Sequence, residues 1–384
     1  MAMFSHRHFK DDPKQFLLYL INSSPIPSSV TCEAGLSTSG FIQTRNAQLV
    51  LNGSQFLFTP PSQRYKVSNV FHEATAASLT VSLQISPGVY NEHVFQGLDF
   101  VIFEARKYII CFILTLSNNY HDFGGRPQYV NWARAAGVPI NKDDDFYTNA
   151  VVKGYCKNHV KVYILSTKSN IVYMDEPTIM AWELINEPHC HVDYSGKTVN
   201  GWVQEMAPFV KSINTKHLLS VGMKGFYGDS IPNRKHRFYY LRRHVAKIIN
   251  MVLFYQIYRV SGQNDNAQME FMQRWMSSHW TDSKTILKKP LVFAEFGKSN
   301  KDPGYTTSVR DSFLNTVHTS IYNSARNGGT IGGGFVWQIL AEGMDSYYDG
   351  YEIVLSQNPS TSSVIAQQSN KMMTFEHIEK ANLK

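Results

Sequence analysis

Short apolar runs alternate with amphipathic segments of helical length along most of this chain, and this alternation constrains the fold more than any other feature. The run at 108–116 is continuous and apolar, which is typical of a strand that a parallel sheet buries on both faces. Repeated strand-then-helix units with no internal sequence repeat predict a parallel α/β fold. A chain of 384 residues is long for one core, yet α/β barrels reach this length as single domains.

The expected elements cover most of the chain beyond residue 41. β-like segments are predicted at 41–44 and 48–51, and Asn52-Gly53 after them is a strong signal for a hairpin turn. Residues 118–143 are interpreted as a polar loop. We expect strands at 79–83, 108–116, 179–187, 217–221, 291–295 and 333–339. We expect helices at 62–77, 94–108, 145–166, 201–213, 267–287, 305–326 and from about 362 to the end.

Two of the predicted strands end in glutamates. The strand at 179–187 stops at Asn186-Glu187-Pro188, because proline cannot continue a hydrogen-bonded ladder. The strand at 291–295 delivers Glu295 shortly before Gly297. The carboxyl ends of barrel strands carry catalytic side chains, and two carboxylates there are what glycoside hydrolysis requires. Taken singly, each glutamate is as well explained as a helix cap or a salt-bridge partner.

Motifs in matching order along the chain resemble the plant endo-β-1,4-mannanases of glycoside hydrolase family 5. The resemblance covers residues 41–227 and 266–380. It implies a (β/α)8 barrel that hydrolyses internal β-1,4-mannosidic linkages in mannan, galactomannan and glucomannan of plant cell walls, with retention. The segments that carry it include Phe41-Ile-Gln-Thr-Arg, Tyr129-Val-Asn-Trp-Ala, Asn186-Glu187-Pro188, Phe293-Ala-Glu-Phe-Gly-Lys-Ser, Trp337-Gln338 and Asp349-Gly-Tyr-Glu-Ile-Val-Leu.

The resemblance assigns a role to four residues. Glu187 matches the proton donor (the general acid/base), and Glu295 matches the nucleophile. Asn186 matches the residue that binds the sugar 2-hydroxyl, and Trp337 matches the ring beneath the sugar that is cleaved. Hydrolysis by two carboxylates needs no metal and no organic cofactor, so we expect none.

The chain departs from the family in its first, second and sixth strand regions. The expected barrel therefore has two alternatives, a complete ring of eight strands or a ring that lacks strands in these regions. No Arg follows Leu79-Thr-Val, where the family has one beside the nucleophile. The family's His-x-Tyr of the sixth strand is also missing, and Tyr255 and Tyr258 are its candidate replacements. The alternative to an active mannanase is therefore a catalytically impaired or inactive relative, at most a carbohydrate-binding barrel.

The expected organisation is an extension with little fixed structure at residues 1–40, followed by one barrel domain at 41–384. The barrel carries an atypical basic segment at 228–266, which contains seven Lys or Arg residues and only two Asp. Such a segment could attract nucleic acid, but no recognisable nucleic-acid-binding module accompanies it. We expect mannan as substrate, no nucleic-acid partner, no membrane association and a monomer.

The cysteines and the amino terminus leave the compartment open. Cys32, Cys111, Cys156 and Cys190 have no metal-ligand spacing and permit disulfides without showing any; Cys111 is interpreted as a core residue and Cys190 as a candidate for exposure. The apolar run at 16–21 faintly resembles a signal-peptide core, without a clean cleavage site. By resemblance, the protein would be secreted to the extracellular space and the cell wall.

Overall fold

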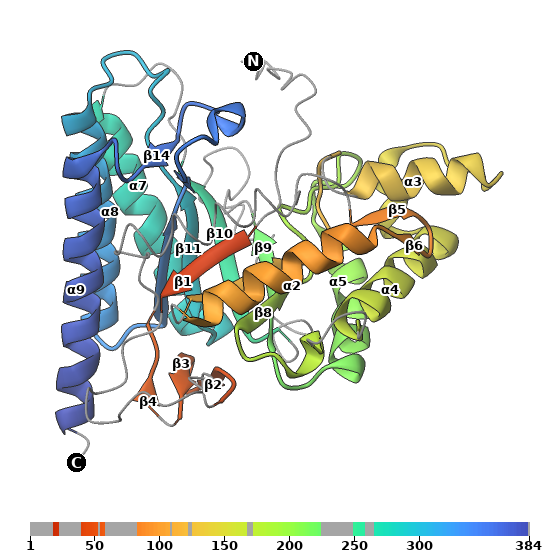
Figure 1. Cartoon of the computed structure of the whole chain (residues 1–384), viewed down its shortest axis with the longest axis horizontal. Helices are drawn as coiled ribbons and strands as arrows, with labels where there is room; N and C mark the ends of the chain where they lie inside the picture. The colour runs from red at the N-terminus through yellow and green to blue at the C-terminus, as the bar shows by residue number, and fades with distance from the viewer. Residues whose placement is uncertain are drawn as a thin grey trace.

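The computed structural model of the chain describes residues 18–22, 40–52, 54–57, 83–107, 110–121, 125–166, 172–223, 249–257 and 265–382. Its centre is a seven-stranded sheet (Figure 1). The strands follow one another in the order β1 (Leu18–Asn22), β7 (Ile110–Thr115), β8 (Ile179–Glu183), β9 (Leu218–Met223), β10 (Met251–Ile257), β11 (Leu291–Phe296) and β12 (Ile331–Val336).

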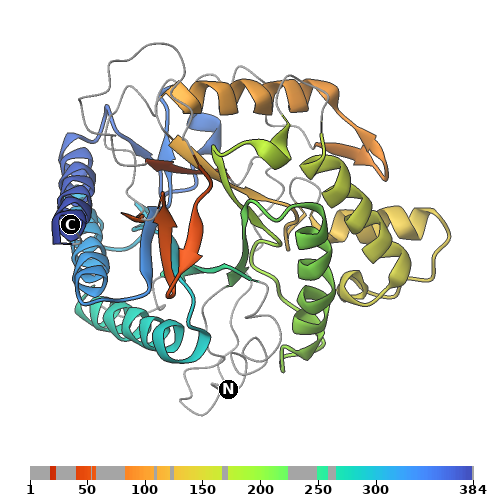
Figure 2. The same ribbon diagram turned by 90° about the horizontal axis from the view of Figure 1, so that it is seen from below.

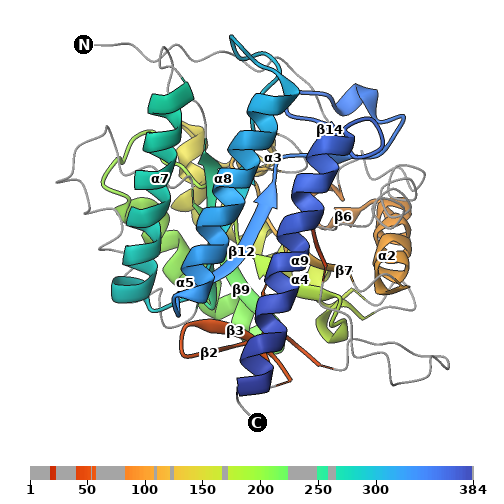
Figure 3. The same ribbon diagram turned by 90° about the vertical axis from the view of Figure 1, so that its left-hand side faces the viewer.

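Helices cover the outside of this sheet, as the view from below shows (Figure 2). The last three, α7, α8 and α9, lie side by side along one flank (Figure 3). The helices are α2 (Glu92–Lys107), α3 (Arg126–Ala135), α4 (Ala150–Ile164), α5 (Lys197–Ile213), α7 (Asp265–Asp282), the π-helical turn η5 (Ser283–Leu287), α8 (Thr307–Arg326) and α9 (Pro359–Asn382), with short 3-10 turns at η1 (Asp143–Tyr147), η2 (Tyr173–Asp175) and η6 (Asp345–Tyr347).

The strands from β7 to β12 are parallel and successive in the chain, so their carboxyl ends meet at one edge of the sheet. Within the described residues every one of these strands except β9 is followed by a helix before the next strand of this sheet, which is the (β/α)8 architecture that we expect from the sequence. Within the described ranges, no pairing joins β12 back to β1 or β7, so this part of the sheet does not close into a ring. The fold is thus an α/β barrel that is unclosed in the described part, as the departures in the first and second strand regions allow.

A strand occupies the sixth position of the barrel, although this region departs from the family in sequence. β10 lies between β9 and β11 and pairs with both in parallel. Its register places the backbone of Tyr255 beside Ala294. Tyr258 and most of the basic segment 228–266 lie outside the described residues.

The amino-terminal extension corrects one expectation. Residues 1–40 are predicted to have little fixed structure, but Leu18–Asn22 form β1, which pairs antiparallel with β7. The strand takes the place at the edge of β7 where a barrel would have its second parallel strand. The extension therefore contributes to the sheet at these five residues. The division of the chain into an extension and one barrel domain stays a prediction.

A small antiparallel sheet packs against the opposite end of the barrel, where the parallel strands begin (Figures 1 and 3). It is formed by β2 (Gln43–Arg45), β3 (Gln48–Leu51) and β4 (Ser54–Gln55) and confirms the predicted hairpin. Ile42, Leu49 and Phe56 are buried in one apolar cluster with residues near the amino ends of the parallel strands, including Cys111, Met180, Leu218, Met251 and Val292. The hairpin thus seals the interior at the end remote from Glu187 and Glu295.

Most predicted helices and strands are confirmed, with shifted ends, but one helix is missed. α3 lies in the stretch predicted as a polar loop. Its apolar residues Tyr129, Val130 and Ala133 are buried, and a proline near its amino end suits the first helical turn. The predicted helix at 62–77 and nearly all of the strand at 79–83 lie outside the described residues. The remaining strands form two small pairs, β5 (Gln84–Ser86) with β6 (Val89–Tyr90) and β13 (Ile339–Leu340) with β14 (Ile353–Val354).

The described helices include none that is long and apolar enough to cross a membrane. The cysteines in the described part, Cys111, Cys156 and Cys190, are buried and unpaired, while Cys32 lies outside it. Cys190 is only 3% exposed, so the expectation that it could be exposed is wrong.

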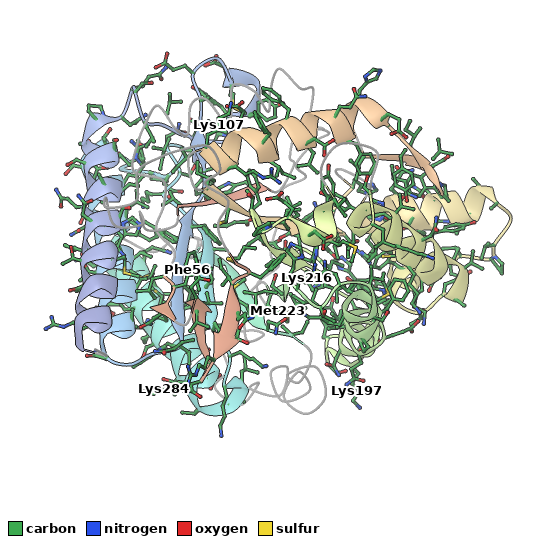
Figure 4. All side chains as sticks on the ribbon, turned by 60° about the horizontal axis from the view of Figure 1, so that its bottom comes forward. Phe56, Lys107, Lys197, Lys216, Met223 and Lys284 are labelled. Carbon is green, nitrogen blue, oxygen red and sulfur yellow. The ribbon has the colours of Figure 1, made fainter. Side chains whose placement is uncertain are left out.

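The hairpin that seals the barrel gives a stability prediction. Phe56 is 3% exposed and lies against the strands, whereas Lys197 and Lys284 lie at the periphery (Figure 4). Replacing Phe56 with Ala should lower the free energy of unfolding by about 3–5 kcal/mol, because it removes buried apolar contacts and leaves a cavity. Urea denaturation at neutral pH measures this. Ile85→Ala, at a site that is 57% exposed, should change stability by less than about 0.5 kcal/mol. Equal stabilities for Phe56→Ala and wild type would show that the hairpin does not seal the core.

Candidate active site

Glu187 lies just beyond β8, in a segment that both neighbouring strands hold. The backbone N–H of Leu184 donates to the carbonyl of Ser220 at 2.8 Å, and the N–H of Asn186 donates to the carbonyl of Ser117 at 2.9 Å. The ladder therefore continues past the regular strand and fixes the turn that presents Glu187. Glu187 is 2% exposed and has a left-handed backbone with φ of 48°.

Glu295 lies within β11 and shares this unusual backbone. Its φ is 56°, and the pairing of β11 with β12 is irregular between Phe293 and Phe296. The side chain is 7% exposed. A non-glycine residue in this conformation costs of order 1–3 kcal/mol and persists where the surroundings impose it, which is commonest at functional sites. Both glutamates that the sequence predicts to be catalytic carry this strain.

Tyr120 contacts Glu187 directly. It follows β7, and its hydroxyl donates to Oε2 of Glu187 at 2.5 Å. Burial raises the pKa of the Tyr120 hydroxyl far above its usual value, and the negative charges of Glu187 and Glu295 raise it further. Because the charges of both glutamates act on this hydroxyl, the two carboxylates face one region at the carboxyl end of the barrel.

Asn186, next to Glu187, is hydrogen-bonded to Asn118 on the neighbouring strand segment. Asn186 Nδ2 donates to Asn118 Oδ1 at 3.3 Å, and the two backbones form a parallel bridge. Asn186 is 4% exposed, and its Oδ1 has no hydrogen-bond partner among the described residues. A buried amide oxygen without a partner is costly unless a ligand supplies a donor. A sugar hydroxyl would supply that donor.

Trp337 is partly exposed at the end of β12, and hydrogen bonds hold it at both ends. Its backbone N–H donates to the carbonyl of Phe296 at 2.9 Å, and its indole Nε1 donates to Asp349 Oδ2 at 2.9 Å. The peptide bond between Trp337 and Gln338 is cis. Gly297 permits this arrangement, since a Cβ there would lie 2.3 Å from the carbonyl oxygen of Trp337. Trp337 thus stands beside the strand that carries Glu295.

A buried ion pair supports the loop that follows Glu187. Arg126 and Asp144 form this pair, and both are nearly inaccessible to solvent. Asp144 Oδ2 also accepts a hydrogen bond from the backbone N–H of Val192 at 2.9 Å. Burial by itself raises the pKa of Asp144, but the hydrogen bond from Val192 and the charge of Arg126 together bring it below the usual value.

The structure places Asn186 and Glu187 just after β8, Glu295 within β11 and Trp337 just after β12, so all four lie toward the carboxyl end of the sheet. Their roles in catalysis and binding stay predictions. Sequence reasoning misses Tyr120 and Asn118, whose only signal is their position just after a predicted strand. In the part of the chain that the structure describes, no group of three or more His, Cys, Asp or Glu could hold a metal ion.

A family model described as "GH family 5 beta-mannosidase-like" matches residues 68–346 of this chain. The chain belongs to this family. A tomato (Solanum lycopersicum) protein named mannan endo-1,4-beta-mannosidase 5 is 49% identical over 95% of this chain and 97% of its own length. A rice (Oryza sativa subsp. japonica) protein named mannan endo-1,4-beta-mannosidase 1 is 46% identical over 87% of this chain and 86% of its own length.

Solved structures of two endo-mannanases share the fold. An endo-1,4-beta-mannanase from Rhizomucor miehei superposes with a TM-score of 0.67 at 21% identity, over 87% of this chain and 99% of its own. An endo-beta-1,4-mannanase from Thermotoga petrophila gives a TM-score of 0.65 at 25% identity, over 84% of this chain and 78% of its own. This chain is therefore a glycoside hydrolase of family 5 with the α/β barrel fold.

The buried ion pair gives a prediction on pH. An aspartate with a depressed pKa in the folded state stabilises the fold fully above its unfolded pKa of about 3.9, and this contribution is lost as the pH falls through the folded value. Asp144→Asn should lower the free energy of unfolding by about 3 kcal/mol at pH 7, because Arg126 keeps a buried charge without its counterion. The difference from wild type should shrink below about pH 4.

Urea denaturation from pH 3 to pH 7 measures both effects. The control is Asp175→Asn, which removes the partner of Lys216 from a half-exposed pair. It should cost less than about 1 kcal/mol. A destabilisation by Asp144→Asn that is the same at pH 3 and pH 7 would contradict the role given to the ionised carboxylate.

Gly297 gives a prediction on geometry. A methyl group at this position would meet the Trp337 carbonyl at 2.3 Å and the Tyr351 ring at 3.0 Å. Gly297→Ala should therefore move Trp337 and lower activity on mannan by roughly 10-fold or more, since small misplacements at a reacting centre are expensive. Gly201→Ala in α5, where nothing lies within 4 Å of the added Cβ, should keep full activity. Full activity in Gly297→Ala would mean that the backbone yields without displacing the ring.

Proposed function

We propose that this protein is an endo-acting mannanase that hydrolyses internal β-1,4-mannosidic linkages of mannan, galactomannan and glucomannan with retention of configuration. The observation that carries the proposal is the pair Glu187 and Glu295. Both are buried, both have a left-handed backbone, and both act on the hydroxyl of Tyr120. Relatives at 49% identity over nearly the whole chain are named for this activity.

The reaction assigns one role to each carboxyl group. Glu295 attacks the anomeric carbon while Glu187 protonates the leaving oxygen, which breaks the glycosidic bond and forms a glycosyl-enzyme. Glu187 then removes a proton from water, whose oxygen attacks the anomeric carbon and releases Glu295. The mechanism requires the two carboxyl groups to lie roughly 5–5.5 Å apart.

The remaining site residues bind the sugar. The Oδ1 of Asn186, which has no partner in the described part of the chain, can accept a hydrogen bond from a sugar hydroxyl, and the resemblance suggests the 2-hydroxyl. The indole of Trp337, held by Asp349, provides an apolar face on which a sugar ring can lie. We infer that these two residues fix the mannosyl unit at the bond that is cleaved.

The alternative, an impaired or inactive relative, is not favoured. The departures from the family concern the first, second and sixth strand regions, and the sixth position holds a strand. The groups nearest the reaction, Glu187 and Glu295, are both held in buried positions at the carboxyl end of the barrel. We further propose a monomer that is secreted to the cell wall and binds neither nucleic acid nor membranes.

The test is endo-activity on soluble galactomannan with folded, monodisperse protein. Wild type should release oligosaccharides whose initial anomeric configuration, followed by NMR, is retained. Glu295→Gln keeps the volume but removes the nucleophile, so its kcat should fall by roughly 10³-fold or more. Glu187→Gln should impair both steps because it removes the proton donor and the base.

A matched control is Glu104→Gln on α2, which removes the partly buried carboxylate partner of the exposed Lys107 and should leave kcat unchanged. Inversion of configuration would overturn the assigned mechanism. No turnover by folded wild type would make the protein a mannanase by descent only.

A further inference from the structure

Tyr120 contacts the acid/base residue directly, and neither the motifs nor the comparisons give it a role. Its hydroxyl lies 2.5 Å from Glu187 Oε2, while 40% of the residue is exposed at the end of the barrel where substrate would bind. We propose that Tyr120 is a positioning residue that orients the carboxylate of Glu187 and stabilises its ionised form. This inference deepens the proposed function and rests on it for the role of Glu187.

The backbone of Tyr120 is held tightly enough for such a role. Its N–H donates to Asn118 Oδ1 at 3.2 Å, and this same oxygen accepts the hydrogen bond from Asn186 Nδ2. Gly125 approaches so closely that a Cβ there would lie 1.7 Å from the carbonyl oxygen of Tyr120. The loop after β7 therefore ties Tyr120, Asn186 and Glu187 into one connected unit.

The charges around the hydroxyl determine which way the hydrogen bond runs. Burial and the carboxylates of Glu187 and Glu295 raise the pKa of Tyr120, so the phenol stays protonated at every pH at which the enzyme would work. A protonated phenol has one O–H to donate, and it donates that proton to Glu187. A hydrogen bond to the charged form of a carboxylate favours that form.

This contact matters most in the second half of the reaction. Glu187 must then act as an ionised base on the attacking water, whereas in the first half it must carry a proton. A donor on Oε2 eases the ionised state after the first proton transfer and keeps the carboxylate from rotating. Tyr120 thus balances the two protonation states that one side chain must adopt in turn.

Tyr120→Phe tests the proposal, because it removes only the hydroxyl. The kcat on galactomannan should fall on the order of 10-fold, as expected for loss of a hydrogen bond to a charged group. The basic limb of the pH profile of kcat/KM, which reports protonated Glu187, should move upward by roughly one unit. Tyr155→Phe on α4 is the matched control, and neither its rate nor its profile should change. A pH profile of Tyr120→Phe that superposes on wild type would overturn the proposal.

A second variant keeps the ring and the hydroxyl. Site-specific 3-fluorotyrosine at position 120 is a stronger donor, so the basic limb should move downward, opposite to Tyr120→Phe. Movement of both profiles in the same direction, or of neither, would show that Tyr120 has only a structural role.

A readout without turnover separates this inference from the proposed function. The carboxyl ¹³C signal of Glu187, assigned with Glu187→Gln in glutamate-labelled protein, should titrate at higher pH in Tyr120→Phe than in wild type. This shift is expected even if the wild type fails to hydrolyse mannan, in which case the proposed function alone would fall. Unchanged titration of Glu187 would reject the contact whether or not the enzyme is active.

Discussion

The parallel ladder from β7 to β12 is the constraint on which the site depends. It aligns six carboxyl ends at one edge, and its hydrogen bonds continue beyond the regular strands. The N–H of Asn119 donates to the carbonyl of Asn186, and the N–H of Gly222 donates to the carbonyl of Ile185. Because the backbone is held on both sides, the turn at Glu187 cannot relax into an ordinary β conformation. The ladder thus stabilises the strained backbone of Glu187, the residue proposed as acid/base.

Two glycines allow close backbone contacts that hold the site residues in addition to the ladder. Gly125 allows the loop after β7 to fold against Tyr120, and Gly297 allows the end of β11 to meet the backbone of Trp337. Behind these contacts, Asp349 holds the indole of Trp337 and Asp144 holds the backbone of Val192. The groups that would touch substrate are therefore supported by residues that do not touch it. Such support is what keeps a catalytic geometry within the small tolerances that rate enhancement demands.

The sequence predicts the parts of the site that sit on strands and misses those that depend on loops. Glu187 and Glu295 stand at the ends of apolar runs of strand length. Their positions at the sheet edge therefore follow from these runs and from the proline and glycine that end them. Tyr120 stands in a polar stretch that resembles an ordinary turn, and its contact with Glu187 spans 67 positions of sequence. The helix α3 is missed for a related reason. Most of its residues are polar, so its buried face of Tyr129, Val130 and Ala133 does not stand out in the sequence. The pairing of β1 with β7 is non-local, and nothing in an isolated pentapeptide specifies its partner.

The same burial that stabilises the barrel limits the pH range over which its chemistry can be observed. Burial lowers the pKa of His159 to about 4 and that of His318 to about 3, so both stay neutral in the folded state well below neutrality. An unfolded histidine takes up its proton near pH 6.5, so each of these residues costs stability progressively as the pH falls below that value. His159 packs among Tyr90, Tyr129 and Tyr163, whereas His318 packs edge-on against Phe296, the residue that follows Glu295. The acid limb of an activity profile therefore reports the unfolding equilibrium as well as the ionisation of Glu295, the proposed nucleophile, and the basic limb is the cleaner probe of Glu187.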